Sequence, residues 1–69
     1  MLRIDPNRIR LLMAERKCTV KALAELIAMD SSNLSRVLVR GKCHPITAAR
    51  VAEGLGVPVA EIILRERVE

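Results

Sequence analysis

Residues 20–37, VKALAELIAMDSSNLSRV, contain two short apolar runs at helical spacing, separated by a break of a few residues. The apolar positions of the first run are Leu23, Ala24 and Ile27, and those of the second are Leu34 and Val37, with Leu38 directly after the quoted stretch. Thr19 is a candidate N-cap for the first helix, and either Asp30 or Ser31 can cap the second. The other positions of the second helix are mostly polar, so this segment predicts two adjacent helices, one with a polar outer face.

The rest of the chain extends this pattern to five short helices. The residues that punctuate them are Asp5-Pro6 before the first helix, Gly41 after the third, Thr47 and Gly56 around the fourth, and Pro58 before the fifth. The apolar positions of these outer helices are Ile9, Leu12 and Met13, then Ala48, Val51, Ala52 and Leu55, then Val59, Ile62 and Ile63. Residues 42–45 are expected to form a loop, and no run alternates at period two. The prediction is an all-α fold: a compact bundle of five short helices in one domain over residues 1–69.

Composition excludes several classes of protein. The chain has 69 residues, 51% of them hydrophobic and none aromatic. That apolar share is too high for a disordered tail, and one domain is the ceiling at this length. Proteins that bind RNA or single strands stack bases on aromatic side chains, which this chain lacks. The longest apolar runs are four residues, so no membrane span is expected, and without a signal peptide the expected compartment is the cytoplasm.

Two short helices joined by a few residues, the second with a polar outer face, have the layout of a helix-turn-helix. The two helices must approach closely, which requires a very small inward residue, and Ala24 supplies it. Met29 supplies the apolar side chain expected beneath the turn. The segment resembles the lambda-repressor and Cro family of helix-turn-helix proteins over a motif at about residues 20–38. The run Arg40-Gly41-Lys42, Pro45 and the segment ARVAEGLGV at residues 49–57 also resemble that family, so the resemblance covers roughly residues 5–64.

The resemblance implies double-stranded DNA as the partner, bound in the major groove. Residues at or beside the family's base-contacting positions are Ser31, Ser32, Asn33, Ser35 and Arg36. Residues expected at phosphates are Thr19, Lys21, Arg40, Lys42 and His44. The chemistry suits these roles, because arginine makes bidentate hydrogen bonds to guanine and serine hydroxyls both donate and accept.

Two positions and the length of one segment depart from the family pattern. Val20 stands where members often have Gln or Ser, which removes one usual phosphate contact. Ala28 stands where a turn glycine is usual, and a positive φ there costs alanine about 1 kcal/mol. The run from Val37 to Gly41 is about one residue longer than usual, which shifts the register of Arg40 and Lys42 on the DNA backbone.

The charge distribution is consistent with this interpretation. Residues 16–50 carry a net charge of +5, whereas residues 51–69 carry −2. Positive charge is thus concentrated on the segment expected to face DNA. The alternative to a DNA-binding surface is a mildly basic helical surface without function. For Arg50 alone, the alternative is a surface ion pair with Glu53, three residues further along the helix.

Catalytic and metal-binding functions find little support. Cys18, Cys43 and His44 are scattered, and neither cysteine belongs to a CxxC pair, so we expect reduced thiols and no metal or cofactor. His44 is interpreted as a loop residue near a phosphate. No catalytic triad, glycine-rich phosphate loop or paired carboxylates occur in a pocket-forming pattern, so the chain is not expected to be an enzyme.

The sequence therefore predicts a small transcriptional regulator, of phage or bacterial type, that blocks a promoter by occupying it. A homodimer, formed in solution or only on DNA, would use the fifth helix and tail at residues 58–69. Its candidate contacts are Val59, Ile62, Ile63 and Val68. The rival interpretation is an antitoxin-like protein-interaction module with secondary DNA binding, for which an extension beyond the last helix would be expected. A DNA-bending recombination accessory protein is a third alternative, but no wing or β-ribbon is predicted.

Overall fold

The computed structural model describes residues 1–64, and this part of the chain is mostly helical. Its elements are β1 (Leu2–Arg3), α1 (Pro6–Glu15), α2 (Val20–Leu26), α3 (Ser31–Arg40), β2 (Lys42–Cys43), α4 (Pro45–Leu55) and a 3-10 helix, η1 (Val59–Glu61). Two predictions need correction. The expected fifth helix is a single 3-10 turn, and two short strands stand where no β-structure was predicted.

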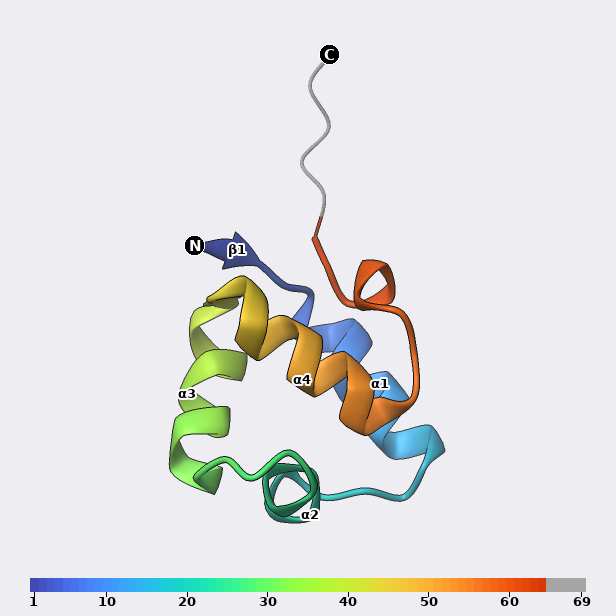
Figure 1. Cartoon of the computed structure of the whole chain (residues 1–69). Helices are drawn as coiled ribbons and strands as arrows, with labels where there is room; N and C mark the ends of the chain where they lie inside the picture. Colours follow the sequence, from blue (N-terminus) through green and yellow to red (C-terminus); the bar gives the residue numbers. More distant parts are fainter. Residues whose placement is uncertain (65–69) are drawn as a thin grey trace.

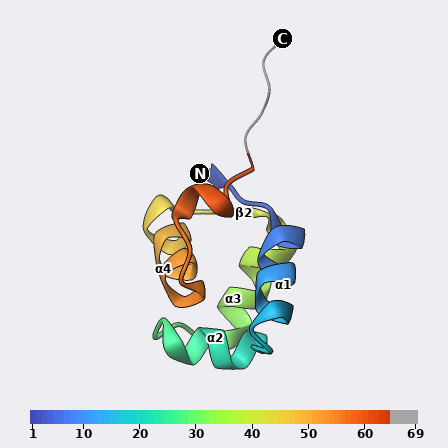
Figure 2. The ribbon, with the colours of Figure 1, turned by 90° about the vertical axis from the view of Figure 1, so that its right-hand side faces the viewer.

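The helices surround one core. Figure 1 shows α3 beside α4, with α1 behind α4 and α2 lying across the end of the bundle where α3 begins. In the perpendicular view, α4 and α1 flank the molecule, α2 closes one end and η1 lies at the other (Figure 2). The short strands lie at the η1 end. Both ends of α3 are therefore held by neighbouring elements, while one side of it faces outward.

The helix starts follow from local capping chemistry. The Asp5 carboxylate accepts a hydrogen bond from the Arg8 amide at 3.2 Å, and the Thr19 hydroxyl accepts one from the Ala22 amide at 3.1 Å. Asp30, rather than Ser31, caps α3. For α4 the predicted cap was wrong: His44 is the N-cap and Pro45 the first helical residue, so Thr47 lies inside the helix. Proline is favoured at this first position because its missing N–H would have no helical partner there.

The helix ends use left-handed residues, as predicted for Gly41 (φ 70°) and Gly56 (φ 73°). Two other ends place non-glycine residues in the same region, Lys17 at φ 51° and Ala28 at φ 56°. After Ala28, the Met29 amide donates to the Ala24 carbonyl at 2.8 Å, and the Ala28 amide donates to the Glu25 carbonyl. This is a Schellman arrangement, and it turns the chain sharply from α2 toward α3.

The strands join distant parts of the chain. β1 pairs antiparallel with β2, with Leu2 opposite Cys43 and Arg3 opposite Lys42. On its other side, Ile4 forms an antiparallel bridge with Ile63, and the Leu64 amide donates to the Arg3 carbonyl at 3.0 Å. The predicted loop at residues 42–45 is therefore a strand leading directly into α4, and it fixes where Lys42 and His44 lie.

The core is aliphatic, as the composition requires. Its buried members are Ile4, Ile9, Leu12, Met13, Leu23, Ala24, Ile27, Leu34, Leu38, Cys43, Ala48, Val51, Ala52, Leu55 and Ile62. Val37 and Met29, predicted as inward positions, are only partly buried but pack against it. Ala24 is buried, as its small side chain predicted. The helices at residues 1–64 are too short and too polar to span a bilayer.

Candidate nucleic-acid interface

The outer side of α3 carries side chains that the core does not use. Leu34 and Leu38 are buried and fix the rotation of the helix. The exposed residues, named here the α3 face, are Ser31, Ser32, Asn33, Ser35, Arg36, Val39 and Arg40. All five residues predicted to contact bases belong to this face. An exposed helix side with hydroxyl, amide and guanidinium groups has the donors and acceptors that base edges require.

The start of α3 has a defined hydrogen-bond arrangement. The Ser32 amide donates to Asp30 Oδ1 at 3.0 Å, and the Ser32 hydroxyl donates to the same atom at 2.8 Å. These bonds lower the pKa of Asp30, and the nearby positive charge of Arg36 contributes to the same direction. Since the ionised carboxylate holds the hydroxyl proton, Ser32 Oγ presents lone pairs outward. At this position Ser32 is therefore an acceptor rather than a donor.

A groove runs beside the α3 face. Its volume is about 230 Å³. The lining residues are Asn33, Arg36, Val37 and Arg40 of α3, Lys42 and Cys43 of β2, His44 and Thr47 at the start of α4, and Met1 and Met29. We name this the α3 groove. Its rim holds three permanent cations and a histidine, and among residues 1–64 no carboxylate lines it, so it is suited to an anion.

The structure thus brings together most of the predicted phosphate contacts. Arg40, Lys42 and His44 share the α3 groove with Asn33 and Arg36 of the α3 face. Thr19 and Lys21 are exposed but lie apart from this groove, at the start of α2. Thr19 Oγ1 accepts the Ala22 N–H, which leaves its own proton able to donate to an anion.

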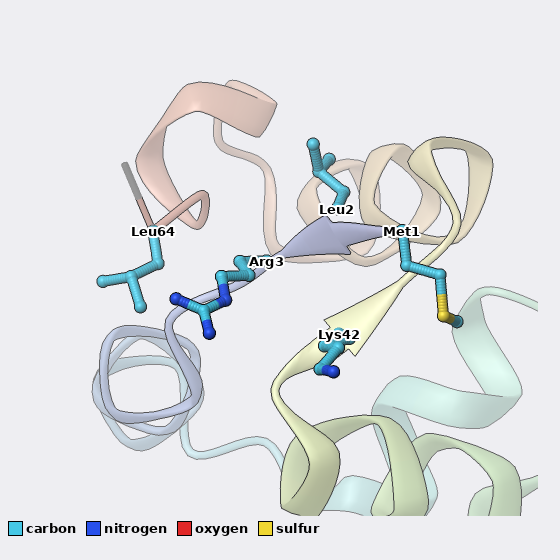
Figure 3. Close-up of a pocket in the computed structure, with 5 residues that line it drawn as sticks. All are labelled: Met1, Leu2, Arg3, Lys42 and Leu64. Atoms are coloured by element: carbon cyan, nitrogen blue, oxygen red, sulfur yellow. The ribbon is translucent and has the colours of Figure 1, made fainter. Parts of the chain in front are cut away.

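A second cavity of about 550 Å³ lies on the other side of Lys42. It is lined by Met1, Leu2, Arg3, Lys42 and Leu64. Figure 3 shows the Arg3 guanidinium between Leu64 and Lys42, with Met1 beyond Lys42. Met1 and Lys42 line both cavities, so positive charge continues from the α3 groove around β2.

The predicted dimer contacts need correction. Ile62 is 0% exposed and belongs to the core, so it is not available to a partner. Ile63 is half-buried and bridges to Ile4, whereas Val59 is exposed. Val68 lies outside the described residues. Of the four candidates, Val59 alone is an exposed side chain within residues 1–64.

Both cysteines are free thiols in the structure. Cys18 is half-buried, while Cys43 is buried on β2, and this burial raises the pKa of the Cys43 thiol. No group of three histidine, cysteine or acidic side chains comes together within residues 1–64 in a way that could hold a metal ion.

Sequence reasoning missed two features of the site. Val39 was not singled out, although it lies on the α3 face with 81% of its surface exposed. A signal for Val39 did exist, since it lies seven residues after Ser32 and three after Arg36 and so shares their helix side. Met1 joins the α3 groove because β1 pairs with β2, and a two-residue strand leaves no periodic signal in the sequence.

Comparison with known proteins finds a similar arrangement in a solved structure. A mutant form of hydroxyethylphosphonate dioxygenase matches with a TM-score of 0.80 and 28% sequence identity. The match covers 97% of this chain but 15% of the dioxygenase chain, so this chain corresponds to a small part of that enzyme. No protein-family model matches the chain, and no curated protein matches it.

Proposed function

We propose that this chain binds double-stranded DNA sequence-specifically, as a small transcriptional regulator of the lambda-repressor and Cro helix-turn-helix type. The observation that carries the proposal is the α3 face: an exposed helix side with two arginines, three serines and an asparagine, backed by buried Leu34 and Leu38. Folding does not require these polar groups, and together they match the donors and acceptors of the major groove.

In this proposal α2, residues 27–30 and α3 form the helix-turn-helix. Ala24 of α2 is buried, and the turn places Ala28 in the left-handed region, where the family pattern has glycine. Met29 packs against the core beneath the turn. These features support the motif because the short connection leaves α3 supported along one side and open along the other.

The mechanism proposed is occupancy of a promoter. α3 enters the major groove, and Arg36 makes a bidentate contact to guanine, while Ser32 Oγ accepts from a base amino group. The cations of the α3 groove contact phosphates and fix the register of the helix. A bound protein then excludes the polymerase, so repression is the expected outcome.

The dioxygenase similarity does not lead us to propose its chemistry here. The matched segment is 15% of the dioxygenase chain, so most of that enzyme has no counterpart in this one. We propose a binding role for this chain on the α3 face alone, and the similarity indicates only that a similar arrangement of helices occurs within a larger protein.

The proposal is tested by selecting bound duplexes from a randomised pool at several salt concentrations. We expect an enriched site containing guanine. Arg36→Ala should relax the preference at that guanine and weaken binding by about 1–3 kcal/mol. Arg10→Ala is the matched control, because Arg10 is an exposed arginine on α1, off the α3 face, and its loss changes the net charge equally.

The outcomes separate the alternatives. A palindromic site indicates a dimer on DNA, and a single half-site indicates a monomer. Weak, unselective binding that disappears at physiological salt would leave only attraction to phosphates and overturn the proposal. The antitoxin-like alternative would then become the leading hypothesis, to be tested with a toxin encoded beside this gene.

A further inference from the structure

An exposed valine interrupts the polar surface of α3. Val39 has 81% of its surface exposed, the highest value among the large apolar side chains of the described chain. It belongs to the α3 face with Arg36 one helical turn before it and Arg40 directly after it. Burial of apolar surface is favourable, so a largely exposed valine among arginines contributes little to folding and is available to a ligand.

The flanking charges indicate the ligand. Two arginines beside the valine favour a polyanion, and the α3 groove continues this positive surface with no carboxylate from residues 1–64 in its lining. An apolar partner on a polyanion is uncommon, but DNA offers one in the major groove: the C5-methyl group of thymine. Valine also suits the task because its χ1 is nearly fixed in a helix, so ordering it costs little entropy.

Helix geometry limits where the thymine lies. Residues three apart on a helix are neighbours on one side, and they are separated by about 4.5 Å along the axis at 1.5 Å per residue. Successive base pairs are about 3.4 Å apart. A valine three residues after the guanine-binding arginine therefore meets a base one or two steps from that guanine.

We propose that Val39 determines specificity by contacting the C5-methyl group of a thymine one or two base pairs from the guanine contacted by Arg36. This inference rests on the DNA-binding function proposed above. It assigns a role to a residue outside the set of predicted base contacts, and it predicts a feature of the binding site before that site is known.

The experiment removes the methyl groups from each partner of the contact in turn: from thymine in the DNA and from Val39 in the protein. In the selected duplex, each thymine is replaced singly by deoxyuridine, which lacks only that methyl. Wild-type protein should lose roughly threefold to tenfold in affinity at one position, as expected for one lost apolar contact. In Val39→Ala the same replacement should cause a much smaller loss, because the two γ-methyl groups of valine are already absent and only the Cβ methyl remains.

Leu11→Ala is the control, since Leu11 is an exposed aliphatic residue on α1. It should retain the full deoxyuridine penalty.

Val39 is exposed and alanine favours helix, so the Val39→Ala variant should keep its fold, which circular dichroism checks. The inference is overturned if a site is enriched and depends on Arg36, yet every deoxyuridine penalty is as large in Val39→Ala as in the wild-type protein. If no site is enriched at all, the proposed function fails and this inference fails with it.

Discussion

At the scale of single residues, the backbone of Ala28 carries an identifiable strain. Its φ of 56° lies in the left-handed region, where the Cβ atom approaches the carbonyl oxygen and costs about 1–2 kcal/mol. The family pattern has glycine here, so the position of the strain could be located from the sequence. Lys17, the corresponding residue after α1, also has a left-handed backbone. This could not be predicted from the sequence, because lysine is common at helix ends for its charge alone.

Ala28→Gly should therefore stabilise the protein. Relief of the left-handed strain is partly offset by the greater freedom of glycine in the unfolded chain, so the net gain should be about 0.5–1 kcal/mol. Urea denaturation at equilibrium measures it. Ala22→Gly is the control: Ala22 lies in α2, where glycine should cost about 1 kcal/mol. Equal destabilisation by both substitutions would contradict the prediction.

At the scale of elements, most helix boundaries could be predicted because their determinants are local. Asp5, Thr19 and Asp30 cap helices through amides two or three residues away, and Gly41 and Gly56 end them. The strands were missed because their pairing joins residues far apart in the chain. The fifth helix was predicted from apolar spacing, but Ile62 is drawn into the core and the chain completes only one 3-10 turn.

Gly54 is a further residue whose role depends on tertiary packing. Glycine inside a helix is normally unfavourable, and no local pattern accounts for it. A Cβ atom at this position would lie 2.7 Å from Cγ2 of Ile27 and 2.9 Å from Cδ1 of Leu23. The glycine thus allows α4 to approach α2 closely, and both neighbouring side chains belong to the core.

Gly54→Ala should consequently destabilise the fold by about 1–3 kcal/mol, because overpacking exceeds the gain in helix propensity. Thermal unfolding provides the measurement. The double variant Gly54→Ala/Ile27→Ala lacks the Ile27 Cγ2 atom with which the new Cβ atom clashes. It should therefore be more stable than the sum of the two single effects predicts. A more stable Gly54→Ala protein would mean that α2 and α4 can separate without cost.

At the scale of the whole molecule, basic side chains line both of the cavities that meet at Lys42. The α3 groove and the second cavity share Lys42, and residues 16–50 carry a net charge of +5. This concentration of charge was predicted from the sequence. The position of Arg3 opposite Lys42 could not be predicted, because it depends on the pairing of β1 with β2, which lie far apart in the chain.

This arrangement predicts how binding to DNA responds to salt. Each phosphate neutralised by a cation contributes about −0.9 to the slope of log K against log salt concentration. Lys42→Ala should therefore reduce the magnitude of the slope by about 1 and weaken binding to all sequences by a similar factor. Fluorescence anisotropy over roughly 50 to 200 mM salt tests this. Arg10→Ala should leave the slope unchanged; an equal change in both variants would indicate a response to net charge alone.

The pairing of residues 3–5 with residues 62–64 has a consequence for protein architecture. Because Ile4 and Ile63 are bridged, the polypeptide enters and leaves this unit at neighbouring points. A unit with adjacent entry and exit fits into a surface loop of a host protein without separating the two sides of that loop. Such a unit is geometrically suited to insertion into a longer chain, and a similar arrangement occupies 15% of the dioxygenase polypeptide.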